Sequence, residues 1–268
     1  MLSRQAIAEQ YKKSSNLEAR IVLHERFGLN KYKWHHWVFD QFELPPAARI
    51  LEIGCGVGKL WLDNLERLPP EWDITLTDFS EGMLQTTQHN LSSSGRPFSF
   101  RVMQAGEITY EDEQFDAVIA NHMLYYVEDK PRVMREMRRV LKPGGRLYTT
   151  TNGTQHLREL VELVAQFDAS LPFVEHLIEG YTLESGAPLV AAAFGEVEVR
   201  RYPDGLRVTD VNALVDYILS SSAIYILPEQ KKAALVQFIQ QRFEAAGGTF
   251  SITKDAGIIC GRRPLTKK

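Results

Sequence analysis

Residues 51–61, LEIGCGVGKLW, decide the fold of this chain. A mostly apolar run leads into the stretch and predicts a buried strand, and glycines follow at positions 54, 56 and 58. The residues from Lys59 onward predict a helix. A strand that passes through a glycine-rich turn into a helix brings the backbone close to a ligand or to another part of the chain. The stretch therefore predicts a strand–loop–helix unit with a candidate ligand loop.

Strands and helices alternate on the C-terminal side of this loop. The pattern predicts strands near 72–78, 98–104, 115–124 and 146–152, and helices near 59–68, 80–95 and 130–145. Ser80 is the expected N-cap of the second helix, and Gly95 lies beyond its end. This rhythm favours right-handed crossovers and an open, mostly parallel sheet, with the ligand beyond the carboxyl ends of the strands.

The two flanks are less regular. The first 45 residues read as helices, and further helices are expected near 156–167, after Thr209 or Asp210, and from Pro228 to Gly247. Residues 197–208, VEVRRYPDGLRV, read as one strand, and residues 249–263 as a terminal hairpin around Lys254–Asp255.

Composition limits the class of protein. The 268 residues are 44% hydrophobic and carry a net charge of −3, which gives no global field for nucleic acid, so no nucleic-acid partner is expected. Two cysteines, Cys55 and Cys260, suggest a reducing compartment. Because no signal peptide and no run of about 20 apolar residues is visible, we expect a cytoplasmic protein without a membrane partner. No His/Cys cluster has zinc-ligand spacing, so no metal is expected.

Two phosphate-binding motifs are excluded at the glycine loop. A P-loop needs a hydroxyl residue after the lysine, and Leu60 follows Lys59. A dinucleotide fingerprint needs glycine at position 59. A tight turn without any ligand stays open as an alternative.

Two carboxylates give the loop a chemical character. Glu52 interrupts an apolar strand, where an unpaired buried charge is costly, so it calls for a cationic partner. Asp78 ends the second strand, 20 residues after Gly58, where a carboxylate accepts from both hydroxyls of a ribose. The expected ligand carries a ribose and a cation, and S-adenosyl-L-methionine has both.

Four ordered segments resemble a known family. ILEIGCGVGKLW (50–61), LTDFSEGML (76–84), FDAVIANHMLYYVED (115–129) and MREMRRVLKPGGRLYTT (134–150) are similar to the successive motifs of class I S-adenosylmethionine-dependent methyltransferases, in the branch of ubiquinone-biosynthesis-type and small-molecule enzymes. The resemblance covers roughly residues 46–151. It implies an α/β, Rossmann-like fold, with a mostly parallel seven-stranded sheet, helices on both faces, an N-terminal helical lid and a helical insertion before the last strand.

The same resemblance implies one structural domain with three parts. These are a lid over 1–45, a cofactor-binding core over 46–152, and 153–268, which completes the sheet and contributes the helices of the substrate pocket.

The resemblance also implies roles for single residues. Glu52, Gly54, Cys55 and Gly56 match the motif that holds the methionine part of the cofactor, and Asp78 matches the acid that binds the ribose. Cys55 contributes backbone, and its side chain reads as a packing residue rather than a nucleophile.

Four further positions match the adenine site. Phe79 and Met83 flank the adenine, with core packing as the alternative. Gln104 and Ala105 stand where the family usually has Asp-Ala, and the amide oxygen of Gln104 still accepts from the adenine amino group.

Asn121 and His122 lie where the methionine chain and the methyl group are expected, and Tyr11 lies in a segment that folds over the cofactor in similar enzymes.

The implied activity is in-line transfer of a methyl group to an O, N or C atom of a small, partly apolar metabolite, with S-adenosyl-L-homocysteine as the product. His122 is the best-placed candidate base, followed by His24, His35 and His36. Trp34 and Trp37 read as core or lid packing, or as a wall of the acceptor site.

The acceptor is left undefined by the sequence. Glu175, His176, Glu179 and Arg207 are candidates to orient it. An enzyme acting on RNA or protein, a non-methylating S-adenosylmethionine-binding protein, and a monomer or a homodimer all stay open.

Overall fold

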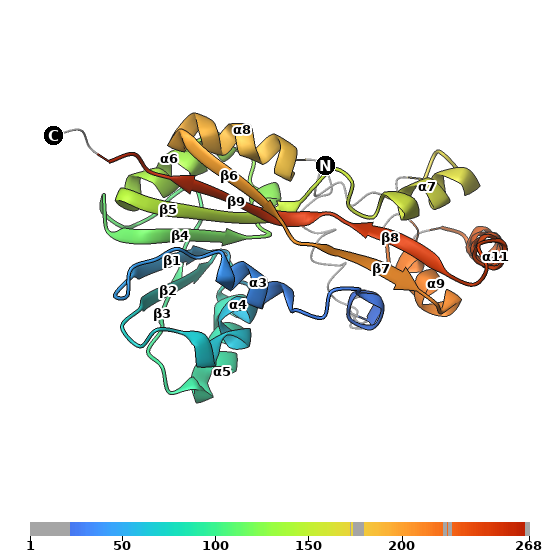
Figure 1. Cartoon of the computed structure of the whole chain (residues 1–268), viewed down its shortest axis with the longest axis horizontal. Helices are drawn as coiled ribbons and strands as arrows, with labels where there is room; N and C mark the ends of the chain where they lie inside the picture. The colour runs from blue at the N-terminus through green and yellow to red at the C-terminus, as the bar shows by residue number, and fades with distance from the viewer. Residues whose placement is uncertain (1–21, 172, 174–179, 222–223, 225–226, 266–268) are drawn as a thin grey trace. The chain divides into compact units, whose positions relative to one another are not determined.

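The computed structural model describes residues 22–171, 173, 180–221, 224 and 227–265. Its contacts divide the chain into two units (Figure 1). The sheet unit comprises Tyr32–Thr154, Leu177–Tyr202 and Ala256–Lys268, and the second unit comprises Met1–Lys31, Gln155–His176 and Pro203–Asp255. Each unit is described below by itself.

The sheet unit is built on seven strands in the order β3-β2-β1-β4-β5-β9-β6. Their bounds are β1 Arg49–Ile53, β2 Asp73–Asp78, β3 Ser99–Val102, β4 Phe115–Asn121, β5 Leu141–Asn152, β6 Glu196–Arg201 and β9 Ala256–Arg262. The first five strands pair in parallel, and β9 lies antiparallel between β5 and β6. The mostly parallel seven-stranded α/β sheet predicted from the sequence is thereby confirmed.

The order of the strands reverses at β1. This strand pairs with β2 on one side and with β4 on the other, so the next strand in sequence and the fourth strand are its neighbours. Such a reversal leaves a crevice beyond the carboxyl ends of the strands. Glu52, Asp78 and Asn121 lie at or near those ends.

Helices cover both faces of this sheet. One face packs against α3 (Trp34–Asp40), α4 (Lys59–Asp63) and α5 (Glu81–Leu91), and the other packs against α6 (Lys130–Val140) and α8 (Leu183–Phe194) (Figure 1). Alternate residues of β1 enter the two cores: Ile50 joins the first, and Leu51 and Ile53 join the second. Because the strand is buried on both faces, it reads as a nearly continuous apolar run.

Local signals set the helix ends. Ser80 caps α5 as predicted, since its hydroxyl accepts from the N–H of Met83 at 3.3 Å, and Gly95 closes the segment in a left-handed conformation. Short 3-10 helices occupy Leu65–Arg67, Ser92–Ser94 and Leu124–Tyr126.

The second unit has its own apolar core. It contains a helix over 22–27, α7 (Arg158–Phe167), α9 (Val211–Leu219) and α11 (Glu229–Ala245), with a two-stranded sheet of β7 (Asp204–Val208) and β8 (Phe250–Lys254). Asp210 caps α9 by accepting from the N–H of Asn212 at 3.0 Å. Leu160, Leu214, Ile218 and Leu235 lie in the core cluster of this unit.

Two predictions about strands are wrong. Residues 197–208 form two strands, β6 and β7, which belong to different sheets and are separated by Tyr202 and Pro203. The terminal hairpin is absent, because β8 pairs with β7 whereas β9 pairs with β5 and β6. Alternation of apolar residues reports which face of a strand is buried, but it does not report the partner strand.

The helix α8 was missed from the sequence. It contains Gly186 and an internal proline, Pro188, both of which argue against a helix. Gly186 is required there, because a Cβ would lie 2.7 Å from side-chain atoms of Ile259 and Tyr181. The helix α3 lies in the range expected as a lid but belongs to the sheet unit, and the lid itself stays a prediction.

Over the part of the chain that the structure covers, no helix combines the length and hydropathy needed to cross a lipid bilayer.

Candidate active site

The glycine loop follows β1 and has an unusual backbone. Gly54 and Gly56 have φ values of 71° and 56°, a region that residues with a Cβ rarely adopt. A Cβ on Gly54 would lie 3.0 Å from Cβ and Cγ of Met123, whereas a Cβ on Gly56 would meet nothing within 4 Å. The loop thus packs closely at Gly54 and faces open space at Gly56, where a ligand could approach the backbone.

Asp78 fixes this loop from the end of β2. Its Oδ2 accepts from the N–H of Gly56 at 3.0 Å, and its Oδ1 accepts from the N–H of Ser80 at 2.9 Å. A carboxylate has about four lone-pair sites, so each oxygen keeps one for a further donor. The buried, oriented carboxylate is therefore suited to two neighbouring hydroxyl groups.

Glu52 is 2% exposed and has two hydrogen-bond donors. Nε1 of Trp61 donates to Oε2 at 2.6 Å, and Nδ2 of Asn121 donates to Oε1 at 2.9 Å. Burial raises the pKa of the Glu52 carboxyl to about 7, the two hydrogen bonds oppose this rise, and the charge of Asp78 adds to it.

The partner expected for Glu52 was a cation. Both donors that the structure shows are neutral, and none of the described residues forms an ion pair with this carboxylate. A buried carboxylate of this kind gains most from a cationic ligand. The residues thus fit a ligand that brings a positive charge to the β1–β4 crevice.

Apolar side chains are exposed along the same edge of the sheet. Phe79 is 75% exposed and Val102, the last residue of β3, is 55% exposed, and Met83 and Val57 are also exposed. A flat apolar ligand would remove this surface from water. Val57 and Val102 were missed from the sequence; the signal was an apolar residue at the end of a strand or in the glycine loop.

Gln104 is exposed and Ala105 is half-buried just beyond β3. The N–H of Met103 donates to the carbonyl of Asp78 at 3.0 Å, which ties the end of β3 to the end of β2. The adenine roles of Phe79, Met83, Gln104 and Ala105 stay predictions.

Asn121 is the last residue of β4, and His122 follows it. Asn121 links Glu52 to the neighbouring strand, because its Oδ1 accepts from the hydroxyl of Thr150 at 3.2 Å. His122 has a φ of 46°, and its N–H donates to the carbonyl and the hydroxyl of Thr150, both at 3.1 Å. A positive φ in a residue other than glycine is sparsely populated and clusters at functional sites.

The imidazole of His122 lies beside Trp34, with ring centres 5.4 Å apart. Burial lowers the pKa of His122 to about 4, and His35 contributes to this shift. The side chain is therefore neutral at pH 7. Trp34 also stacks on Trp37 at 5.4 Å and meets Tyr202 edge-on at 5.3 Å, so Trp34 lies between His122 and the rest of an aromatic cluster.

The other three candidate bases have neighbours of their own. Nδ1 of His35 lies 2.8 Å from the Asp63 carboxylate, and Nε2 of His36 lies 2.9 Å from the Asp63 carbonyl, so both are held at the end of α4. Burial lowers the pKa of His35, and Asp63 opposes this. His24 belongs to the second unit, where it stacks near His156.

Cys55 packs beneath the loop. Its Sγ lies 3.9 Å from the hydroxyl of Thr87, and burial raises the pKa of the thiol far above neutrality. A protonated, buried thiol is a poor nucleophile, in agreement with a packing role. Tyr11, Glu175, His176 and Glu179 lie outside the described residues.

In the described ranges, no three His, Cys, Asp or Glu side chains gather in a way that could hold a metal ion.

Comparisons with known proteins agree with this geometry. Residues 51–149 match a family model described as a methyltransferase domain. The chain is 30% identical over 233 residues to the biotin biosynthesis bifunctional protein BioHC of Saccharophagus degradans. That match covers 82% of this chain and 40% of the relative. The chain is also 32% identical over 118 residues to the demethylmenaquinone methyltransferase of Symbiobacterium thermophilum. That match covers 42% of this chain and 46% of the relative.

This chain thus spans less than half the length of either curated relative. Among solved structures, a methyltransferase from Bacillus halodurans superposes with a TM-score of 0.61 at 15% identity, over 87% of this chain and 99% of that one. At that identity the likeness concerns the fold alone.

Proposed function

We propose that this chain, which belongs to the class I S-adenosylmethionine-dependent methyltransferases, binds S-adenosylmethionine at the carboxyl edge of its sheet and methylates a small molecule. The pair Glu52 and Asp78 carries the proposal. The ammonium of the methionine part would supply the cation that Glu52 lacks among the described residues, and the two ribose hydroxyls would donate to Asp78. The glycine loop would approach the methionine chain through Gly56.

S-adenosylmethionine, when bound, supplies both an activated methyl group and its own leaving group. The chain has to orient two reactants and keep water out, and alignment of this kind is worth about 7–11 kcal/mol. Glu52, held by donors from α4 and β4, and Asp78, held by two backbone N–H groups, are fixed in position for this task.

His122 is the proposed proton acceptor when the acceptor atom is a hydroxyl oxygen. It follows Asn121, which contacts Glu52, and no described residue forms a hydrogen bond with its ring nitrogens. The low pKa keeps the imidazole neutral and able to accept a proton, but it also makes a weak base. We therefore expect a contribution at the low end of the usual range, about 10²-fold.

A His122→Gln variant tests this role. Glutamine keeps a hydrogen-bonding side chain but removes the base, so kcat falls about 10²-fold and its dependence on pH is lost, while S-adenosylmethionine affinity stays. An unchanged kcat, with or without a rise in KM, assigns His122 to packing against Trp34.

A small acceptor is favoured over a macromolecule by two observations. The net charge of −3 offers no field for a phosphate backbone. The names of the two curated relatives mention biotin and demethylmenaquinone, and both of these compounds are small molecules.

The decisive experiment has two stages. Titration calorimetry with S-adenosylmethionine and S-adenosylhomocysteine tests the binding, and the absence of micromolar binding refutes the proposed function. Incubation with methyl-labelled cofactor and separate extracts of metabolites, RNA and protein then tests the acceptor. Label in the metabolites supports the proposal, label only in RNA or protein refutes the small-molecule class, and binding without any transfer indicates a non-methylating protein.

A further inference from the structure

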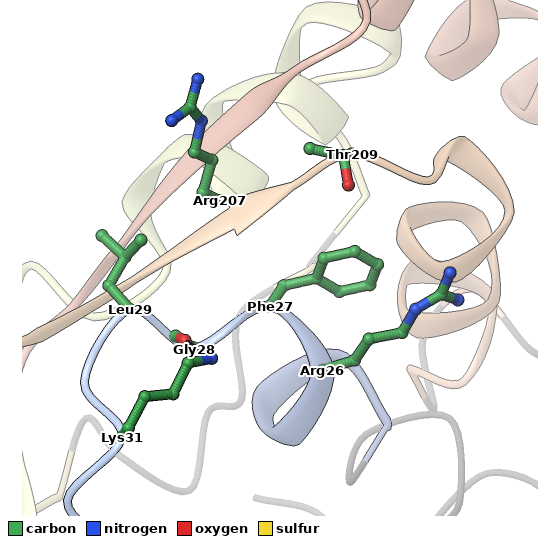
Figure 2. A pocket seen from close by; sticks show the side chains of 7 residues that line it. All are labelled: Arg26, Phe27, Gly28, Leu29, Lys31, Arg207 and Thr209. Carbon is green, nitrogen blue, oxygen red and sulfur yellow. Dashed lines mark hydrogen bonds between the residues drawn. The ribbon is translucent and has the colours of Figure 1, made fainter.

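A pocket of about 370 Å³ opens to solvent on the second unit (Figure 2). Figure 2 shows Arg207 leaving β7 on the face opposite to Phe27 and Lys31. Arg26 and Lys31 are already held, the first by a carboxylate at 2.8 Å and the second by a backbone carbonyl at 2.7 Å. The described cations therefore do not converge on one anion site, and the role of Arg207 in orienting an acceptor stays a prediction.

Polar side chains do converge in the sheet unit, in a row across three neighbouring strands. Glu52 of β1 is in register with Ile119 of β4, and Asn121 of β4 is in register with Thr150 of β5. Because side chains alternate along a strand, Asn121 lies on the same face as Ile119. This face packs against α4, from which Trp61 reaches the second oxygen of Glu52.

The hydrogen bonds of this row all run in one direction. The backbone N–H of His122 donates to the Thr150 hydroxyl at 3.1 Å, and this hydroxyl donates to Oδ1 of Asn121 at 3.2 Å. Nδ2 of the same amide then donates to Oε1 of Glu52 at 2.9 Å. A backbone N–H can only donate and an ionised carboxylate can only accept, so the two ends fix the direction of every bond between them. Each bond polarises the next, which strengthens the donor that reaches the carboxylate.

The hydroxyl of Thr150 is not needed for packing. The residue is 0% exposed, and a valine would fill nearly the same space without the cost of burying a polar group. The hydroxyl instead holds Oδ1 of Asn121 away from Glu52, where an amide oxygen would repel the carboxylate. Thr149 is equally buried, but its hydroxyl points to the opposite face and lies 2.8 Å from the hydroxyl of Tyr181.

We propose that Thr150 is a positioning residue of the cofactor site, whose hydroxyl holds the Asn121 amide as a donor to Glu52. The same hydroxyl ties that amide to the backbone of His122. Ionisation of Glu52 and the backbone at His122 are thereby coupled. The importance of this role for methyl transfer rests on the proposed function, whereas the orientation of the amide does not.

Other titratable groups surround this row. The charge of Asp78, on β2, adds to the raised pKa of the Glu52 carboxyl. Cys55, in the glycine loop, stays protonated, because burial raises the pKa of its thiol far above neutrality. His122 stays neutral near pH 7, since burial lowers its pKa to about 4. The ionisation of Glu52, with a pKa of about 7, can thus be followed where neither Cys55 nor His122 changes charge.

The test follows NMR signals of the isotope-labelled full chain as the pH is changed. Nε1 of Trp61 donates to Oε2 of Glu52, so the indole N–H signal reports the ionisation of that carboxyl without any cofactor. Glu52→Gln should abolish this titration, which assigns the signal. The backbone N–H signal of His122 should shift with the same midpoint as the Trp61 indole. A His122 signal that does not follow this midpoint overturns the proposal, whatever the variants show.

Three variants separate the hydroxyl from the fold. Thr150→Val should raise the midpoint of the indole titration by about 0.5–1 pH unit, because the carboxylate loses a polarised donor. Thr150→Ser keeps a hydroxyl and should keep the parent midpoint. Thr149→Val removes an equally buried hydroxyl from the same strand and should lower the unfolding temperature without moving the midpoint. A folded Thr150→Val chain with the parent midpoint, or the same rise in Thr149→Val, refutes the role.

Calorimetry with S-adenosylmethionine at pH 7 distinguishes this inference from the proposed function. Thr150→Val should bind about three- to tenfold more weakly than the parent chain, whereas Thr150→Ser and Thr149→Val should bind normally. If the parent chain does not bind, the proposed function fails, and the indole midpoints still decide whether Thr150 orients the amide. If the parent chain binds and a folded Thr150→Val chain binds equally well, Thr150 does not position the cofactor site and the proposal is overturned.

Discussion

Cofactor binding should be coupled to the ionisation of Glu52. In the free protein, burial raises the pKa of this carboxyl to about 7, and its donors Trp61 and Asn121 are neutral. The ammonium of S-adenosylmethionine is attracted only to the ionised carboxylate. Binding therefore expels the proton from Glu52, and affinity should rise with pH.

The size of this effect follows from the pKa. With a pKa of about 7, about one tenth of the protein has Glu52 ionised at pH 6 and about nine tenths at pH 8. Because the apparent dissociation constant equals the intrinsic constant divided by the competent fraction, affinity should increase about tenfold between these values, about 1.4 kcal/mol. His122, with a pKa of about 4, and the protonated thiol of Cys55 do not titrate in this interval.

The assay is titration calorimetry at pH 6, 7 and 8, each in two buffers with different enthalpies of ionisation. The difference between buffers counts released protons, and we expect about 0.9 at pH 6 and about 0.1 at pH 8. In Glu52→Gln, which keeps the shape of the side chain but cannot ionise, this proton release should vanish and affinity at pH 8 should fall. Equal affinity of the parent chain at pH 6 and 8, or the same proton release from Glu52→Gln, would refute the reasoning.

Three further predictions concern the same site. Since the pKa of Glu52 is raised above its ordinary 4.5, its contribution to stability is complete below about pH 4.5 and is lost as pH rises through 7. Glu52→Gln should therefore be more stable than the parent chain at pH 8, by up to about 3 kcal/mol in the free energy of unfolding, but not at pH 5. Calorimetric scans should show this as a higher unfolding temperature of the variant at pH 8 only. Asp78→Ala should weaken S-adenosylmethionine binding by about 10-fold or more, because two charged hydrogen bonds to the ribose are lost. Asp73→Ala, at the exposed start of β2, is the control and should bind the cofactor normally. Equal affinities of the two variants would show that Asp78 does not bind the ribose. Gly54→Ala should lose cofactor binding and about 1–2 kcal/mol of stability, measured by urea unfolding, because a Cβ there would meet Met123. Gly95→Ala, at a similar φ but with open space around the Cβ, should keep cofactor binding. Retained binding by Gly54→Ala would show that the loop tolerates a side chain.

The glycine loop and the acids at the strand ends could be predicted because their signals are local. A glycine can be read as a backbone requirement, and the acids at 52 and 78 were found from their place relative to predicted strand ends. The exposed apolar side chains of Val57 and Val102 were not predicted, because an isolated valine in a sequence is typical of an ordinary core residue until its neighbours are known. The partners of Glu52 escaped for the same reason: Trp61 and Asn121 are 9 and 69 residues away in the chain.

The sequence by itself determined an α/β sheet of parallel strands, the glycine loop and the two carboxylates, since periodicity, turn residues and strand-end acids are written within a few residues of one another. Strand partners were decided only by the tertiary structure. Residues 197–208 divide at Pro203 between the two sheets, and residues 249–263 divide at Asp255 in the same way. The reason is that the pairing of a strand depends on distant segments that must be buried together. The pKa of Glu52 is likewise a tertiary property, because burial among segments that are distant in the chain creates it.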